Sequence, residues 1–188
     1  MALYVLPRPE GNDWALEVPE SSGTSAQMAL DLLNRVHTEF QDGETVQLGS
    51  TMLVARQERP GLIVLHTSDG SGQSVDRSAH LPVYVWSAQQ GHCAINAVDC
   101  EPPNPDQGVA LTSRVLAGAH VDGARRAGVS ESGWIFVDSE WDGRTETVTL
   151  TPTGDLCLAR PDLAPYLALP FGWGIFGGGD EIKAYRLA

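Results

Sequence analysis

A proline-rich segment near the middle of the chain constrains the possible folds more than any other feature. Residues 101–108 read Glu-Pro-Pro-Asn-Pro-Asp-Gln-Gly, with three prolines in five residues. Proline lacks the backbone N–H that helices and sheets use, and it disfavours helical backbone in the residue before it. The segment therefore predicts a division into an N-terminal α+β region over residues 1–100, a linker over 101–108 and a second α+β domain over 109–188.

The first half contains the clearest helix pattern and a hairpin signal. From about Thr24 to Gln41, apolar residues recur with the spacing of one helical face: Ala29, Leu32, Leu33, Val36 and Phe40. The sequence Glu-Arg-Pro-Gly over 58–61 is a turn signal, so the runs on either side of it should pair as a hairpin. Further strands are predicted over 3–6, 14–18 and 81–86.

In the second half the pattern is mainly that of strands. The runs 109–117, 132–137 and 146–151 favour strands, residues 161–169 favour a short helix, and a last strand passes through Ile182 and Tyr185. Together the two halves predict an α+β fold with a mostly antiparallel sheet, one long helix and one short helix.

Charge limits the kinds of partner. The chain has 188 residues and a formal net charge of −12, which repels phosphate backbones and anionic lipid surfaces. We therefore expect no nucleic acid and no membrane as partner, and instead a basic protein. A secretory signal is missing from the first residues, no apolar run is long enough for a membrane helix, and three cysteines do not form a disulfide framework. These features predict a cytoplasmic protein.

One segment, residues 131–142, places two tryptophans and a phenylalanine among four acids. Its first part alternates as a strand does, with Trp134, Phe136 and Asp138 on one face and Ile135 and Val137 on the other. An acidic, aromatic turn follows. A core strand with a solvated turn is an equally good interpretation of this pattern taken alone.

As a binding edge, the same segment would use Trp141 as a hydrophobic anchor and exposed acids as a charged rim. The predicted partner-binding residues are Glu131, Asp138, Glu140, Trp141 and Asp142. Because these acids are exposed by pattern, nothing in the sequence would raise a pKa for acid–base chemistry.

Other candidate chemistry is weaker. His92 and Cys93 are adjacent and would point to opposite faces of a strand, and the spacing of Cys93 and Cys100 does not match common zinc sites. We expect no catalytic residue, no metal and no cofactor, and hence no enzyme. Two alternatives remain open: a small hydrolase or transferase that uses Cys93 with a distant histidine, and an adaptor module that binds a peptide at an open sheet edge.

The second half also resembles a known family. The residues that carry the resemblance are Leu111-Thr-Ser-Arg-Val-Leu116, then Ser132-Gly-Trp-Ile-Phe136, then Pro161-Asp-Leu163 and finally Leu169-Pro-Phe-Gly-Trp-Gly-Ile-Phe176. In order and spacing they are similar to the immunity-protein-thirty-three-like domain, formerly a bacterial domain of unknown function, over residues 111–176. The chain departs from the family at Arg125-Arg126, where an Arg-Glu step is usual, and in the segment after Ser-Gly-Trp.

This resemblance implies a bacterial immunity protein, an antitoxin that serves bacterial competition. Such a protein binds a cognate toxin and neutralises it by occluding the active site. The acidic composition fits a toxin with a basic active site, as enzymes that attack anionic substrates have.

Overall fold

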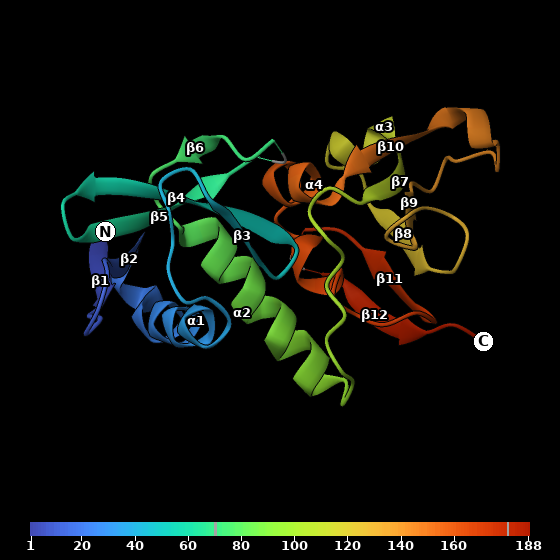
Figure 1. The fold of residues 1–188 in the computed structure, drawn as a ribbon. Helices are drawn as coiled ribbons and strands as arrows, with labels where there is room; N and C mark the ends of the chain where they lie inside the picture. The colour runs from blue at the N-terminus through green and yellow to red at the C-terminus, as the bar shows by residue number, and fades with distance from the viewer. Residues whose placement is uncertain (70, 180) are drawn as a thin grey trace. The chain divides into compact units, whose positions relative to one another are not determined.

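The structure is a computed structural model of the chain, and it describes residues 1–69, 71–179 and 181–188. The chain divides into two compact units, Met1–Ser87 and Ala88–Ala188. Each unit contains one six-stranded sheet with helices (Figure 1). Residues 101–108 lie in the second unit, where the N–H of Glu101 donates to the carbonyl of Ala168 at 2.8 Å. The division into 1–100, 101–108 and 109–188 stays a prediction.

The first unit is built on a sheet with the strand order β1-β2-β5-β4-β3, and β6 pairs with β5. Strands β2 and β5 run parallel, and the remaining described pairs are antiparallel. The predicted hairpin is present as β4 and β5. The elements of this unit are β1 (Ala2–Leu6), β2 (Asp13–Val18), η1 (Glu20–Ser22), α1 (Gly23–Val36), β3 (Thr45–Leu48), β4 (Thr51–Arg59), β5 (Leu62–Ser68) and β6 (Ser74–Asp76).

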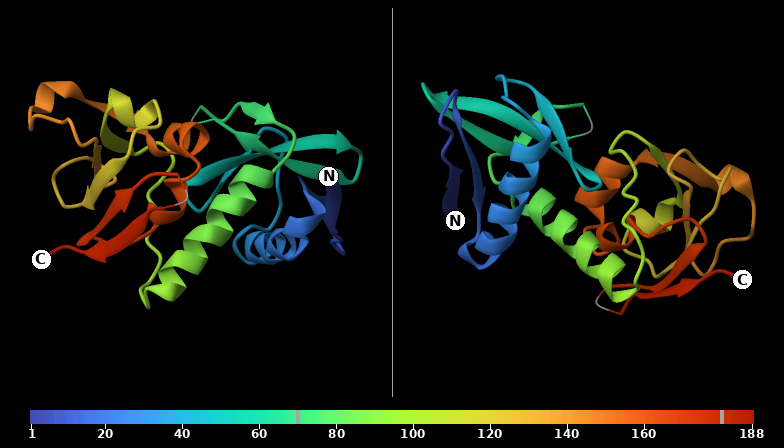
Figure 2. Two further views of the ribbon diagram at one scale, coloured as in Figure 1. Left: turned by 180° about the vertical axis from the view of Figure 1, so that it is seen from behind. Right: turned by 60° about the horizontal axis from the view of Figure 1, so that its bottom comes forward.

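Helix α1 packs against β1 and β2 and closes the core of the first unit (Figure 2). The buried helix residues are Ala26, Ala29, Leu30 and Leu33, so the core-facing stripe begins three residues earlier than the sequence pattern indicates. Leu32 and Val36, predicted for the buried face, are exposed. Phe40 follows the helix instead of belonging to it; it is buried, and its ring centroid lies 4.6 Å from that of Trp14.

The prediction of a strand over 81–86 is wrong, because these residues begin the helix α2 (His80–Ile95). A short apolar run with β-branched residues has the same appearance in a strand and in a buried helix. Here the partly or fully buried positions Val83, Trp86, Gln89 and Cys93 recur at helical intervals. Pro82 lies in the first turn, where the missing N–H costs no helical hydrogen bond.

The second unit is built on a sheet in the order β10-β7-β9-β8-β11-β12. Strands β7 and β9 run parallel, and the other described neighbours are antiparallel. The elements are β7 (Gly108–Thr112), α3 (Ser113–Leu116), β8 (Val121–Arg125), β9 (Trp134–Val137), η2 (Thr145–Thr147), β10 (Val148–Pro152), α4 (Thr153–Ala159), η3 (Ala164–Tyr166), β11 (Trp173–Gly177) and β12 (Lys183–Arg186).

One face of this sheet is tied to the segment that contains η3. The fully buried Trp134 donates its indole N–H to the carbonyl of Leu167 at 2.9 Å. The buried guanidinium of Arg125 donates to the carbonyls of Leu169 at 2.6 Å and Ser132 at 3.1 Å. A buried cation is tolerated when its donors are satisfied in this way. Arg125 is thus a core residue and adds no positive charge to the surface.

The α+β class with mostly antiparallel strands is confirmed. The alternation predicted for 134–138 is also confirmed, since Trp134, Phe136 and Asp138 are buried while Ile135 and Val137 are half-buried. Within the described ranges, no helix has the length and apolar character needed to cross a bilayer.

Candidate functional site

The candidate site is the acidic turn, which we define as residues 138–147 between β9 and β10. It begins at Asp138, directly after the last residue of β9. The carboxylate of Asp138 accepts a 2.7 Å hydrogen bond from the Thr112 hydroxyl and a 3.0 Å bond from the backbone N–H of Glu140. The Thr112 hydroxyl holds the pKa of Asp138 below its usual value. Asp138 therefore stays ionised and anchors the turn to β7.

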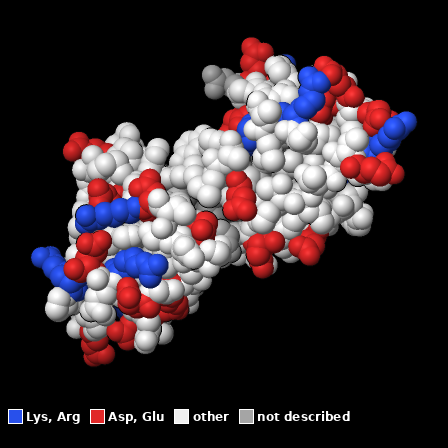
Figure 3. Space-filling view, turned by 90° about the horizontal axis from the view of Figure 1, so that it is seen from above, with Lys and Arg blue, Asp and Glu red and all other residues white. Residues whose placement is uncertain are grey.

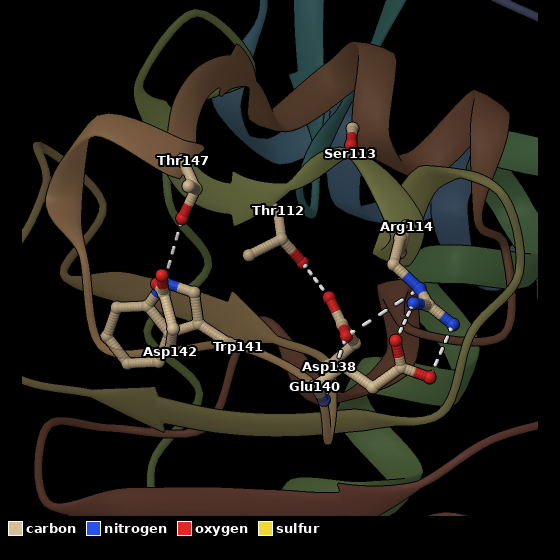
Figure 4. Close-up of a pocket in the computed structure, with 8 residues that line it drawn as sticks. All are labelled: Thr112, Ser113, Arg114, Asp138, Glu140, Trp141, Asp142 and Thr147. Atoms are coloured by element: carbon tan, nitrogen blue, oxygen red, sulfur yellow. Dashed lines mark hydrogen bonds and ion pairs between the residues drawn. The ribbon is translucent and has the colours of Figure 1, made fainter.

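Arg114, on the one-turn helix α3, neutralises part of the negative charge of this turn. Its guanidinium pairs with both carboxylate oxygens of Glu140 and lies 3.8 Å from the carboxylate of Asp138. Figure 4 shows the guanidinium facing both acids, opposite the ring of Trp141. At the other end of the turn, Asp142 pairs with Arg144 at 3.3 Å. Both pairs are solvent-exposed, so they add little stability.

Trp141 is half-buried and is bonded within the turn itself. Its indole N–H donates to the carbonyl of Arg144 at 3.0 Å and reaches the Thr147 hydroxyl at 3.1 Å. Its backbone N–H donates to the carbonyl of Asp138 at 3.1 Å. The ring is consequently held in place before any partner arrives, which lowers the entropy that binding would cost.

Two hollows meet at Trp141. The first, of about 250 Å³, is shown in Figure 4 and is lined by Thr112, Ser113, Arg114, Asp138, Glu140, Trp141, Asp142 and Thr147. The second, of about 540 Å³, is lined by His120, Val121, Asp122, Val137, Asp138, Ser139, Trp141 and Phe176. Asp138 and Trp141 belong to both. Both hollows lie wholly within the second unit.

The structure brings together four of the five predicted site residues. Asp138, Glu140, Trp141 and Asp142 line the first hollow, whereas Glu131 precedes β9 and lies at the opposite end of that strand. The Glu131 carboxylate accepts a 3.0 Å hydrogen bond from the N–H of Gly108. The prediction that Asp138 is exposed is wrong: only 7 % of it is accessible, because it faces the same side of β9 as the buried rings.

Sequence reasoning missed Thr112, Arg114, Asp122 and Phe176. Thr112 and Asp122 come from β7 and β8, whose pairing with β9 is a long-range property of the sheet, and Arg114 is on α3, directly after β7. Phe176 carried a local signal, since it alternates with the buried Ile175 and must point to the other face of β11.

On the face shown in Figure 3, Asp and Glu are scattered, and several lie beside Arg or Lys. On this face the acidic side chains form no single patch. Charge alone therefore does not single out the acidic turn, and its ring and hollows have to do so.

The cysteine that the alternative hypothesis needs is not built as a nucleophile. Cys93 lies on α2, is 2 % exposed, and its thiol faces the carbonyl of Ala168 at 3.6 Å. Burial raises its pKa to about 12, and the reactive form of a thiol is the thiolate. The neighbouring His92 packs its ring against Tyr166, with centroids 4.3 Å apart. The sequence argument considered a strand here and the structure has a helix, but His92 packs on Tyr166 and no hydrogen bond joins its ring to Cys93 among the described residues.

A second polar group lies on the sheet of the first unit. His66 is buried, its Nδ1 is 3.0 Å from the Ser74 hydroxyl, and its Nε2 is 3.3 Å from the Glu58 carboxylate. The order serine, histidine, acid is that of a hydrolase triad. However, His66 Nε2 makes no hydrogen bond to Glu58, and Arg77 lies 3.5 Å from the same carboxylate oxygen. We interpret the group as a polar network that stabilises the sheet.

Comparison with known families now adds to this geometry. The fold and the acidic turn define an α+β domain whose candidate site is an open surface. Residues 88–185 match the model of the Imm33-like domain, and because this is more than half of the chain, the protein belongs to that family. The resemblance over 111–176 is thereby confirmed and extended. The family is of the immunity-protein type. No curated protein and no solved structure matches the chain.

Proposed function

We propose that this protein is a bacterial immunity protein that binds a cognate toxin and neutralises it by covering the toxin's active site. Membership of the Imm33-like family supports a protein partner. The observation that carries the proposal is the placement of Trp141, a fixed ring that lines two hollows beside exposed carboxylates. Fixed aromatic side chains of this kind are the usual anchors of protein interfaces.

The mechanism follows from charge and shape and includes no chemical reaction. A net charge of −12 attracts a toxin whose active site is basic and accelerates the encounter. Trp141 is then buried against the toxin, and the acidic rim pairs with its basic groups. The toxin acts, in this proposal, in the cytoplasm, where the immunity protein also resides.

The five predicted residues take different roles in this proposal. Glu140, Trp141 and Asp142 contact the toxin directly. Asp138 positions them, since it bonds to Thr112 and to the N–H of Glu140. Glu131 contacts only a toxin that spans the length of β9, because it lies beyond the other end of that strand.

The test is binding to the proteins encoded next to this gene, measured by calorimetry with purified partners. We expect one of them to bind, and Trp141→Ala to weaken its binding by about 2 kcal/mol. Tyr84→Ala is the matched control, since Tyr84 is an exposed ring on α2 in the first unit. Equal affinity of the Trp141→Ala variant and the wild type would remove the acidic turn from the interface.

The charge component has its own test. Reversing Glu140 and Asp142 to lysine should slow association and flatten its dependence on salt. The control reverses Glu10 and Glu20, two exposed acids of the first unit, and changes the net charge equally. If both double variants slow association to the same extent, the effect comes from overall charge and the acidic turn has no special role.

A further inference from the structure

The second hollow beside Trp141 differs from the first in what it offers a partner. Its lining contains two carboxylates, two aromatic rings and the exposed His120, and includes no lysine or arginine among the described residues. We propose that this hollow receives an arginine side chain of the toxin, between Trp141 and Phe176 and against Asp122. This rests on the proposed function and names the group of the partner that the hollow recognises.

Charge is the first argument. Asp122 is exposed on β8, and its carboxylate accepts a 3.1 Å hydrogen bond from the Tyr185 hydroxyl. In the described part of the chain it forms no ion pair, whereas the acids of the first hollow are paired with arginines: Asp138 and Glu140 with Arg114, and Asp142 with Arg144. The acids of the first hollow are therefore already neutralised in part by arginine side chains of the protein itself, whereas the Asp122 carboxylate in the second hollow can pair with a cation of the partner.

The rings are the second argument. Phe176 is 59 % exposed, although its strand β11 is paired on both sides, with β8 and with β12. It shares its face of β11 with Gly174, and the space over Gly174 is taken by the ring of Tyr185, whose hydroxyl donates to Asp122. Trp141 borders the same hollow and is held by its indole hydrogen bonds. A cation between two ring faces gains from the negative charge of each π-system.

The size and the residual polar groups favour arginine over lysine. The hollow, of about 540 Å³, is larger than a single ammonium group requires. A planar guanidinium stacks on rings and still directs several N–H donors toward a carboxylate, whereas an ammonium is a compact point charge. Asp138 also lines the hollow, but its carboxylate is engaged by Thr112 and Arg114, so we assign the guanidinium to Asp122, which accepts a hydrogen bond from Tyr185 and forms no ion pair among the described residues.

The direct test uses a peptide in place of the toxin. Acetyl-Gly-Arg-Gly-amide should bind weakly and saturably in an NMR titration, and shift the amide of Phe176 and the indole N–H of Trp141. The same peptide with citrulline, which has the shape of arginine and no charge, should bind about tenfold more weakly. The lysine peptide should be intermediate. Equal binding of the citrulline peptide, or no saturable shift at these residues, would overturn the proposal.

Variants locate the effect. Asp122→Asn removes the proposed charge partner of the guanidinium and Phe176→Ala removes one of the rings, so each should weaken binding of the arginine peptide by about tenfold. Both side chains are exposed, so neither substitution removes core packing. Leu150→Ala is the control, since Leu150 is similarly exposed and lies on β10 of the same sheet. An equal loss in the control would show that the peptide binds the sheet nonspecifically and contradict the proposal.

With the toxin available, the same variants separate this proposal from the proposed function. If a toxin binds and neither Asp122→Asn nor Phe176→Ala weakens it, the arginine site is wrong while the immunity function stands. If no neighbouring protein binds and the arginine peptide still selects this hollow, the immunity function is wrong while the site stands. A double-mutant cycle between Asp122→Asn and each arginine of the toxin identifies the residue that occupies the hollow.

Discussion

Thr112 and Asp138 join two strands at the point where both end: the Thr112 hydroxyl donates to the Asp138 carboxylate at 2.7 Å. Thr112 is the last residue of β7, and Asp138 follows the last residue of the parallel strand β9. Because Asp138 also accepts the N–H of Glu140, the carboxylate connects the sheet with the acidic turn. These bonds fix the start of a turn whose residues are mostly exposed.

Thr112→Val should raise the pKa of Asp138 toward its usual value, since the hydroxyl bond is the main cause of the lowered pKa. A carboxyl with a lowered pKa stabilises the fold above its unfolded pKa of about 4, and this is lost as pH falls through the folded pKa. The variant should therefore lose stability above pH about 4 and show a weaker loss on acidification. NMR titration of the Asp138 carboxyl carbon measures the pKa directly.

The control for this variant is Thr149→Val on the adjacent strand β10. The Thr149 hydroxyl donates to the carbonyl of Leu111 at 3.4 Å and contacts no carboxylate. We expect the pKa of Asp138 to stay unchanged in that variant. If the pKa of Asp138 were unchanged in both variants, the hydrogen bond from Thr112 would not connect Asp138 to β7.

Local periodicity made part of this site predictable. The alternation in 134–138 shows which residues of β9 point inward, and it places Asp138 with Trp134 and Phe136. The prediction that Asp138 is exposed was nevertheless wrong. An acid after a strand is usually solvated, and the partner that buries this one, Thr112, is 26 residues away in the sequence. The role of Arg114 could not be predicted from the sequence either, since its contact with Glu140 depends on the parallel pairing of β7 with β9.

The missed helix α2 has a different cause. Gly91 and the β-branched run around Val83 and Val85 oppose a helix locally, and single-sequence patterns weigh only such local preferences. Burial overrides these local preferences. Val83 belongs to the core of the first unit, and Gln89 and Cys93, which are residues of the second unit, hydrogen-bond to carbonyls of that unit. Both sets of contacts come from distant residues, so no window of the sequence contains them.

The end of α2 supplies a stability prediction. Ala97 has φ = 53°, and it is the one non-glycine residue with positive φ in the described ranges. The N–H of Val98 donates to the carbonyl of Cys93, and that of Ala97 to Ala94, the pattern that normally places glycine at this position. Ala97→Gly should therefore raise the free energy of unfolding by about 1 kcal/mol in urea denaturation.

Within the same helix, the opposite exchange should also stabilise. A Cβ at Gly91 would meet no atom within 4 Å, so Gly91→Ala gains about 0.5–1 kcal/mol of helix propensity without a clash. Ala94→Gly, at an exposed helical position with ordinary φ, is the control and should destabilise by about 1 kcal/mol. If Ala97→Gly destabilised to the same extent as Ala94→Gly, the left-handed end of α2 would be wrong.

His66 predicts how stability depends on pH. Burial lowers its pKa from the usual 6.5, and the nearby Glu58 opposes this effect only in part. The unfolded chain therefore binds a proton at a higher pH than the folded chain does, so unfolding becomes easier as pH falls below about 6.5. His66→Gln should reduce this loss between pH 7 and the folded pKa, measured by urea denaturation at each pH.

His80→Gln is the matched control, because His80 is exposed at the start of α2. We expect its pH profile to follow that of the wild type. His92 has a pKa that burial lowers as well, so some acid sensitivity should remain in the His66 variant. A profile of the His66 variant identical to that of the wild type would mean that His66 is not buried in the folded chain.

Thiol reactivity tests the conclusion that Cys93 is buried and not activated as a nucleophile. Burial raises the pKa of Cys93 and of Cys157 to about 12, so at pH 8 both remain thiols, and their burial also blocks access. Cys100 is half-buried and should react first with iodoacetamide. Peptide mass spectrometry of briefly labelled native protein measures the order, and Cys100→Ser should abolish the early modification. Labelling in urea should modify all three cysteines. If Cys93 of the native protein reacted as fast as a free thiol, burial would be refuted at that position, and the cysteine-dependent hydrolase or transferase would again compete with the immunity function.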